Sequence, residues 1–253
     1  MRSIGFKKVN ALARGFKMLE LLARKEGPLG ISEIAASLRM HKGTVYNMVH
    51  TLCELDVLEN SGGKFIFGPK LYMLGKAAEK GSDLIRTVHP HLERISRHTN
   101  LSALLGMRSG LGVVILDKAD SGLNFKISTD IGIEIPLLAG AHGKAFLSQL
   151  ADEDVDDLLA GMELRQFTAH SCVSKIEYKQ MIRQTRAEGI AWDKEEYIEG
   201  IRALAVPLET GRKTPQTALW VVGVNGLLKD PEMESYSRLL KEAAEEIRQQ
   251  FST

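Results

Sequence analysis

The sequence lacks long hydrophobic runs and has few cysteines. No stretch of about 18 consecutive apolar residues occurs among the 253 residues, so we expect no transmembrane helix. The first residues also lack the apolar core and small-residue cleavage site of a secretory signal. The two cysteines, Cys53 and Cys172, lie far apart, which excludes a disulfide framework. A reducing, cytoplasmic location is the simplest interpretation.

Net charge is small overall but uneven along the chain. Residues 1–80 contain 13 Lys and Arg against 7 Asp and Glu, a net charge of +6. Residues 81–253 contain 20 against 25, a net charge of −5, and the two parts give the total of +1. A basic N-terminal part on a mildly acidic remainder is typical of a DNA-binding module joined to a second domain. Uneven surface charge without any nucleic-acid partner is the alternative.

The stretch from Ile31 to Leu58 predicts two short helices, about 32–38 and 42–55, joined by a tight turn. In the second helix, apolar residues at helical spacing predict a buried stripe. Its members are Val45, Met48, Val49, Leu52 and Leu55. Polar residues occupy the opposite side, which predicts a surface that enters a DNA major groove. Asn47 is suited to a bidentate contact with adenine, because its amide carries both a donor and an acceptor.

Neighbouring segments complete a small domain. A helix is predicted over 9–25, and two short strands over 57–59 and 64–67 flank the turn residues of a hairpin. This order is that of a winged helix-turn-helix, in which Lys64 lies on the wing. The candidate DNA-binding residues are Lys42, Gly43, Thr44, Tyr46, Asn47, His50 and Lys64. The alternative is that these side chains are simply solvated.

The remaining chain predicts a two-domain α+β protein. We expect the winged helix-turn-helix over 1–68, a linker helix over 69–82 and a second domain over 83–253. Helices are predicted over 83–99, 140–150, 152–159, 174–188 and 230–251. Strands are predicted over 101–107, 111–116, 124–128, 203–208 and 217–224. Strands paired in hairpins with helices packed on them are used by small-molecule sensors.

Four segments resemble the IclR (isocitrate lyase regulator) family of transcription factors, in the family's order. They are ISEIAASLRMHKGTVYNMVHTL, KFIFGPKLYMLG, IPLLAGAHGKAFLSQL and RAEGIAWDKEEYIEGIRALAVPL. The resemblance implies an N-terminal winged helix-turn-helix, a linker helix and a C-terminal GAF-like effector-binding domain. It also implies a homodimer, or a tetramer made from two dimers, that binds operator DNA under the control of a small metabolite.

The resemblance places the effector near IPLLAGAHGKAF, where small residues precede a helix whose N–H groups suit a carboxylate. The residues that it implies are Ile127, Ile135, Ala141, His142, Asp193, Ile201, Ala203, Trp220 and Val222. Trp220 and Val222 replace two serines that are usual in the family. We therefore hypothesise a carboxylate effector with an apolar or aromatic body, held by His142 and the backbone near Ala141. The alternative is that Trp220 belongs to the core and fills the pocket.

A second departure concerns the helix-turn-helix turn, where Arg39 stands in place of the glycine that the family usually has. A left-handed conformation costs a residue other than glycine roughly 1 kcal/mol, so we expect the turn to differ. The family's usual arginine is also replaced by Asn47, so the operator sequence does not transfer from relatives.

Other chemistry has weaker support. The spacing of His89, His91 and His98 lacks a zinc signature, and we expect no metal and no cofactor. Asp193 and the two glutamates that follow Lys194 have no accompanying nucleophile motif. An enzyme and a protein-interaction adaptor are the competing functions, and both fit the basic N-terminal part less well.

Overall fold

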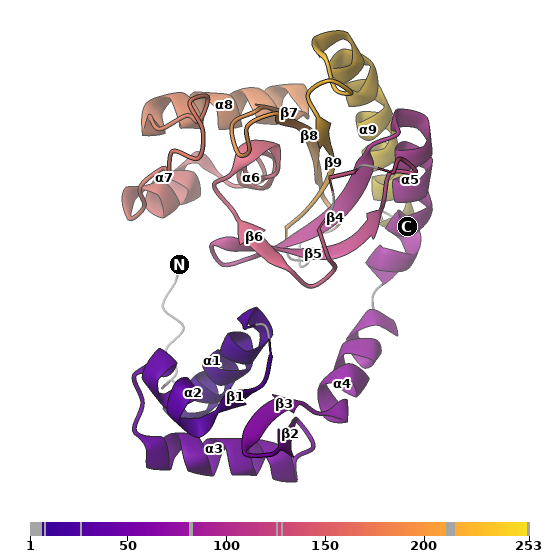
Figure 1. The fold of residues 1–253 in the computed structure, drawn as a ribbon. Coiled ribbons are helices and arrows are strands. Elements are labelled where there is room, and N and C mark those ends of the chain that lie inside the picture. The colour runs from indigo at the N-terminus through magenta and orange to yellow at the C-terminus, as the bar shows by residue number, and fades with distance from the viewer. Residues whose placement is uncertain are drawn as a thin grey trace. The chain divides into compact units, whose positions relative to one another are not determined.

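The computed structural model describes residues 7, 9–25, 27–80, 83–124, 126–127, 129–210 and 216–251, and the chain divides into two compact units. The first comprises residues 1–82 and the second residues 83–253. Each unit is described by itself below (Figure 1). None of the helices in the described ranges is long and apolar enough to cross a membrane.

In the described residues, the first unit contains four helices and a small antiparallel sheet. Its elements are α1 (Asn10–Arg24), β1 (Leu29–Gly30), α2 (Ile31–Leu38), α3 (Lys42–Glu54), β2 (Leu58–Ser61), β3 (Lys64–Phe67) and α4 (Pro69–Lys80). The strand order is β1-β3-β2, and β2 and β3 form the wing. The core joins α1, α2 and α3 to the wing, through buried residues that include Met18, Ile34, Val45, Val49 and Phe65. This order of elements is the predicted winged helix-turn-helix.

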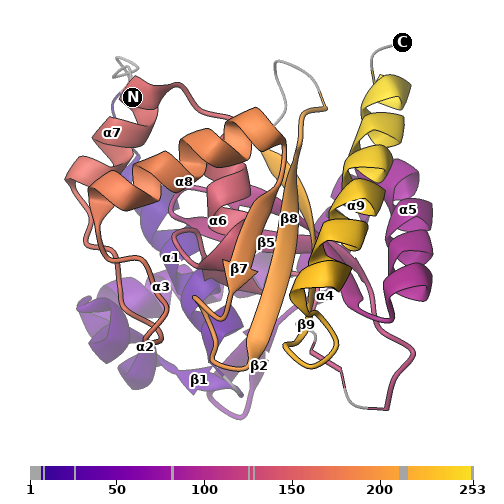
Figure 2. The same cartoon turned by 90° about the horizontal axis from the view of Figure 1, so that it is seen from above.

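The second unit is built on a six-stranded antiparallel sheet with the strand order β6-β5-β4-β9-β8-β7. Its strands are β4 (Ser102–Ser109), β5 (Gly112–Ala119), β6 (Glu134–Pro136), β7 (Ala191–Lys194), β8 (Ile201–Leu208) and β9 (Thr217–Val224). Its helices are α5 (Asp83–Thr99), α6 (Gly140–Leu147), α7 (Asp152–Ala160), α8 (Lys175–Glu188) and α9 (Asp230–Phe251). Figure 2 shows α5 and α9 side by side along one face of the sheet, with α6 and α8 on the other.

The two faces of the sheet belong to two separate cores because side chains alternate along each strand. On β9, Leu219 and Val221 point to α5 and α9, whereas Ala218 and Trp220 point to α6. Three alanines on β8 and β9 face α6, namely Ala203, Ala205 and Ala218. They let α6 pack closely on the sheet, so the candidate effector residues lie in a crowded layer.

Several predictions of local structure were wrong. Asn124, Lys126 and Ile127 are not in a strand, and the other two residues of that predicted strand lie outside the described residues. Strands β6 and β7 were not among the predicted strands. Leu55, assigned to the buried stripe of α3, is 54% exposed because α3 ends before it.

Candidate functional sites

The turn between α2 and α3 keeps a left-handed conformation without glycine. Arg39 has φ 52° and ψ 48° and ends α2, so the expected difference in the turn does not occur. The N–H of Arg39 donates to Ala36 O at 3.3 Å, and that of Met40 donates to Ala35 O at 2.9 Å. His41 then caps α3, because its Nδ1 accepts a hydrogen bond from the Gly43 N–H at 3.2 Å. These contacts fix where α3 begins.

Helix α3 has one buried and one exposed face. Val45 and Val49 are fully buried in the core of the first unit. The exposed candidate DNA-binding residues are Lys42, Gly43, Tyr46, Asn47 and, on the wing, Lys64. Thr44 and His50 are half-buried. The ring centroids of Tyr46 and His50 lie 4.2 Å apart, so the two rings form one packed pair.

In the second unit, the start of α6 is built from close contacts. Gly140 has φ 59°, and a Cβ there would lie 2.3 Å from Asp193 Oδ2. A Cβ on Gly143 would lie 2.1 Å from the carbonyl oxygen of Leu137. Asp193 therefore places its carboxyl group against the first residue of α6. The other carboxyl oxygen, Oδ1, accepts from the N–H of Glu196 at 2.7 Å, and burial raises the pKa of Asp193 to about 6.

His142 is neutral and its proton position is fixed. Its Nε2 lies 2.9 Å from the carbonyl oxygen of Pro136, which can only accept, so Nε2 carries the hydrogen. Burial lowers the pKa of His142 to about 4, which leaves Nδ1 as an acceptor at neutral pH. The imidazole also packs on Trp220, with ring centroids 5.6 Å apart. In this arrangement His142 has no free N–H for a carboxylate, contrary to the role that we hypothesised.

Trp220 lies in the core between the sheet and α6, and it is only 4% exposed. Its indole occupies the space that Gly106 leaves on β4, because a Cβ there would lie 2.6 Å from Trp220 Cη2. The structure thus favours the alternative in which Trp220 is a core residue. The predicted effector residues Ala141, His142, Asp193 and Ala203 are also buried. Ile135, Ile201 and Val222 are half-buried.

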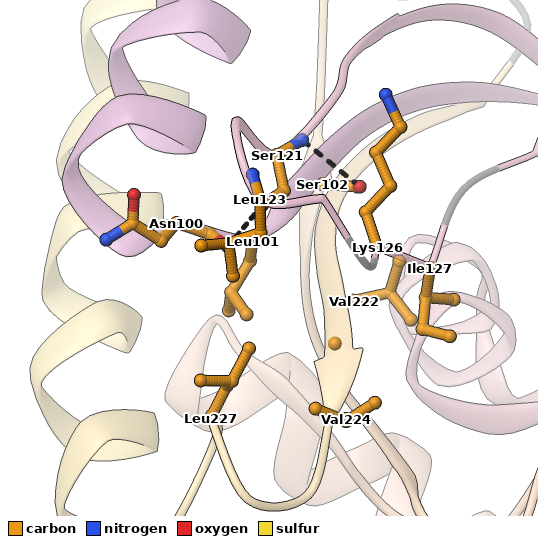
Figure 3. A pocket seen from close by; sticks show the side chains of 11 residues that line it. Asn100, Leu101, Ser102, Ser121, Leu123, Lys126, Ile127, Val222, Val224 and Leu227 are labelled. Atoms are coloured by element: carbon orange, nitrogen blue, oxygen red, sulfur yellow. Dashed lines mark hydrogen bonds between the residues drawn. The ribbon is translucent and has the colours of Figure 1, made fainter.

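Ile127 and Val222 meet at a hollow near the end of β9, which Figure 3 shows. The described residues that line it are Asn100, Leu101, Ser102, Ser121, Leu123, Lys126, Ile127, Val222, Gly223, Val224 and Leu227. Two of its polar side chains already have partners: Ser121 Oγ donates to Asn100 O at 2.7 Å, and Lys126 Nζ pairs with Asp120, outside the lining, at 3.0 Å. Val222 joins this hollow to the α6 side of the sheet, since it also packs on that core.

A buried ion pair between α6 and the segment after β7, close to Asp193, was not predicted from the sequence. Lys144 Nζ lies 2.6 Å from Glu196 Oε1, and the two side chains are 2% and 13% exposed. The hydroxyl of Tyr178 is buried nearby, and it has no hydrogen-bond partner in the part of the chain that the structure describes. A lysine inside the small-residue run GAHGKAF was the available signal for the pair. Nothing in the sequence pointed to Tyr178.

Comparison with known proteins decides the family. The model described as "Bacterial transcriptional regulator IclR C-terminal" matches residues 76–249, and the "IclR helix-turn-helix domain" matches residues 11–62. The chain belongs to the IclR family. IclR-family proteins are transcriptional regulators and not enzymes, which decides against the enzymatic alternative.

Relatives within the IclR family match most of the chain. The transcriptional repressor IclR of Escherichia coli is 27% identical over 243 residues, which are 94% of this chain and 89% of that protein. The structure of an IclR regulator from Alicyclobacillus acidocaldarius has a TM-score of 0.86 at 25% identity, covering 98% of this chain and 100% of that one. An IclR homolog from Microbacterium hydrocarbonoxydans, solved in complex with 4-hydroxybenzoate, has a TM-score of 0.80 at 18% identity, covering 96% and 99%.

Proposed function

We propose that this IclR-family chain reads a specific operator through the exposed face of α3. The observation that carries the proposal is the geometry of α3, whose buried Val45 and Val49 leave Asn47 exposed on the opposite face. Asn47 and the Tyr46–His50 pair are placed to contact bases in a major groove. Lys42, Gly43, Thr44 and the wing residue Lys64 are assigned to phosphates, which position the helix without reading sequence.

The test begins with an operator selected from a pool of random duplexes by the full-length protein. Asn47→Ala should weaken binding to this operator by about 1–3 kcal/mol, because the bidentate contact with one base is lost. Binding to a random duplex should change little. Lys42→Ala is the matched control, since a lost phosphate contact weakens binding to both duplexes equally. Equal losses for Asn47→Ala on the two duplexes would remove its base-reading role.

We also propose that the functional unit is a homodimer or a dimer of dimers. Two helices of the first unit expose large apolar side chains that its core does not use. On α1 and just before it, Val9, Leu12 and Phe16 are 60–64% exposed, and on α4, Tyr72, Met73 and Leu74 are 57–71% exposed. Contiguous exposed apolar surface marks an interface, and paired helix-turn-helix units read paired half-sites. Leu12→Glu with Phe16→Glu should therefore lower the oligomeric state measured by sedimentation.

The second unit is proposed to bind a small organic acid that controls DNA binding. The proposed contacts are those around the start of α6, with the carboxylate held by the backbone near Ala141. The relative solved with 4-hydroxybenzoate supports an aromatic body. Because His142 uses its only N–H on Pro136, we assign its Nδ1 to accept from a hydroxyl or N–H of the effector instead.

This effector assignment is tested by thermal unfolding of the full-length protein with matched acids. The panel pairs 4-hydroxybenzoate with benzoate, and lactate with propionate. Stabilisation by the hydroxylated member of a pair, lost in His142→Phe, supports the assignment. Stabilisation by neither pair contradicts the organic-acid proposal. Equal stabilisation by both members contradicts only the role of His142.

A further inference from the structure

A hollow in the first unit is lined by several positively charged side chains. Of its lining residues, only Thr44 has been assigned to DNA above. Its described lining residues are Arg14, Lys17, Leu38, Arg39, Met40, His41 and Thr44, and we call it the basic hollow. Arg14 and Lys17 are three residues apart on α1, so they share one helical face. Arg39 comes from the turn after α2, and His41 and Thr44 from the start of α3. Three elements thus contribute to one surface.

The basic hollow offers hydrogen-bond donors and no acid. None of its lining residues in the described part of the chain is Asp or Glu, and Arg14, Lys17 and Arg39 form no ion pair there. Because Nδ1 of His41 accepts from the Gly43 N–H, the neutral ring carries its hydrogen on Nε2. Three cationic side chains, one imidazole N–H and one hydroxyl therefore surround the space. Such a lining suits an anion with several oxygens, such as a phosphate group.

Arg39 supplies a second and independent observation. With φ 52° and ψ 48° it occupies the left-handed region, where glycine is more stable than any residue with a Cβ. Its side chain is exposed, so burial in the core does not offset that strain. A strained residue that persists without a packing role points to a function of its side chain. Because the surrounding side chains are cationic, we attribute this function to the positive charge of Arg39.

We infer that the basic hollow binds a backbone phosphate of DNA, with Arg39 kept in a strained conformation for its positive charge. This inference rests on the proposed DNA binding and adds a contact next to the reading face of α3. Thr44 lines the hollow at the first turn of α3, whose start the cap at His41 fixes. A phosphate bound there would hold the end of α3 that enters the groove. Arg14 and Lys17 would hold the same phosphate or its neighbour from α1.

Two substitutions at Arg39 separate charge from strain. Arg39→Gly removes the charge and relieves the backbone, so the unfolding midpoint should rise by about 4 °C while DNA binding weakens. Arg39→Lys keeps both the charge and the strain, so both properties should stay close to those of the unsubstituted protein. If the side chain of Arg39 serves DNA binding, Arg39→Gly should raise stability and lower DNA affinity. Without such a role, the substitution should raise stability and leave DNA affinity unchanged.

The measurement is the salt dependence of binding to a fluorescent 30-base-pair duplex of random sequence, since phosphate contacts do not depend on sequence. For Arg39→Gly, the slope of log K against log salt should fall by about 0.9 for each hollow that contacts DNA. Adding Arg14→Gln and Lys17→Gln should lower it further. Arg97→Gln, an exposed arginine on α5, is the matched control and should leave the slope unchanged.

Each outcome separates the inference from the function on which it rests. If the unsubstituted protein binds no duplex at low salt, the proposed DNA binding fails, and the inference fails with it. If that protein binds and Arg39→Gly has the same slope as Arg97→Gln, only the inference is overturned. A site for free phosphate would instead show stabilisation by inorganic phosphate at constant ionic strength, with an unchanged slope for duplex binding, and this result would also overturn it.

Discussion

Helices α3 and α6 each begin close to a left-handed residue, but in opposite surroundings. Each follows or includes a left-handed residue, Arg39 with φ 52° before α3 and Gly140 with φ 59° at the start of α6. The start of α3 is exposed and bordered by cationic side chains. The start of α6 is buried, and the carboxyl group of Asp193 already lies against it. The same local feature is thus open to solvent beside α3, whereas at α6 it is covered by a carboxyl group of the protein itself.

This difference predicts that removing a charged side chain lowers stability strongly on α6 and very little on α3. Lys144→Ala on α6 should lower the free energy of unfolding by about 3–5 kcal/mol, because it leaves Glu196 buried without its partner. Tryptophan fluorescence during urea unfolding measures this, since both tryptophans lie in the second unit. The exposed Lys42→Ala on α3 should change stability by less than about 0.5 kcal/mol. A double variant, Lys144→Met with Glu196→Leu, should recover much of the loss, and a loss that stays would mean that packing dominates.

Glycines in the first turns of the two helices should also differ. Gly143→Ala should destabilise the protein by about 3 kcal/mol, because its Cβ would lie 2.1 Å from the backbone oxygen of Leu137. Gly43→Ala is the matched control, since its nearest neighbour would be His41 Nδ1 at 3.3 Å. Circular dichroism during thermal unfolding compares the two variants. A similar loss for both would show that α6 can move away from the segment that contains Leu137.

Buried ionisable groups should make the second unit respond to pH in two opposing ways. Burial raises the pKa of Asp193 to about 6 in the folded state, against about 3.9 in the unfolded state. Its contribution to the free energy of unfolding is therefore full below about pH 4 and is lost as pH rises through 6. His142 behaves in the opposite sense, because burial lowers its pKa to about 4. Its contribution to the free energy of unfolding is full above about pH 6.5 and is lost as pH falls towards 4. The two effects largely cancel in the unsubstituted protein.

Removing one of these two groups should make the pH dependence caused by the other one measurable. For Asp193→Asn, stability relative to the unsubstituted protein should improve by about 2 kcal/mol between pH 4 and pH 7, since only the Asp193 contribution has been removed. Urea unfolding at several pH values measures the difference. A difference that does not vary with pH would mean that Asp193 stays ionised in the folded state. Glu245→Gln, on an exposed part of α9, provides the control.

Elements with a clear local pattern were predicted well. The predicted bounds of α5, β9 and α9 match the structure, because amphipathic periodicity and apolar runs are local properties of the chain. Strand β7 was missed since its four residues carry too little pattern. The family and the two-part fold followed from motifs distributed along the chain, and the family models confirm them.

The candidate effector site was harder to predict because its contacts join distant residues. Lys144 and Glu196 are 52 positions apart, and no spacing rule pairs them. Gly106 and Trp220 fit one another across adjacent strands, which only the register of β4 and β9 reveals. The hydrogen on His142 is fixed by a backbone carbonyl, and sequence shows side chains only. For these reasons the carboxylate role of His142 had to be reassigned.

The match between Gly106 and Trp220 also makes the second unit a starting point for engineering. An indole side chain that rests on a bare backbone can be exchanged for a free indole molecule of the same outline. Replacing Trp220 by glycine would leave a space whose shape is already known and whose walls are set by the neighbouring strands. Free indole should bind in this space and raise the unfolding temperature of the variant, so that its stability would depend on an added aromatic compound.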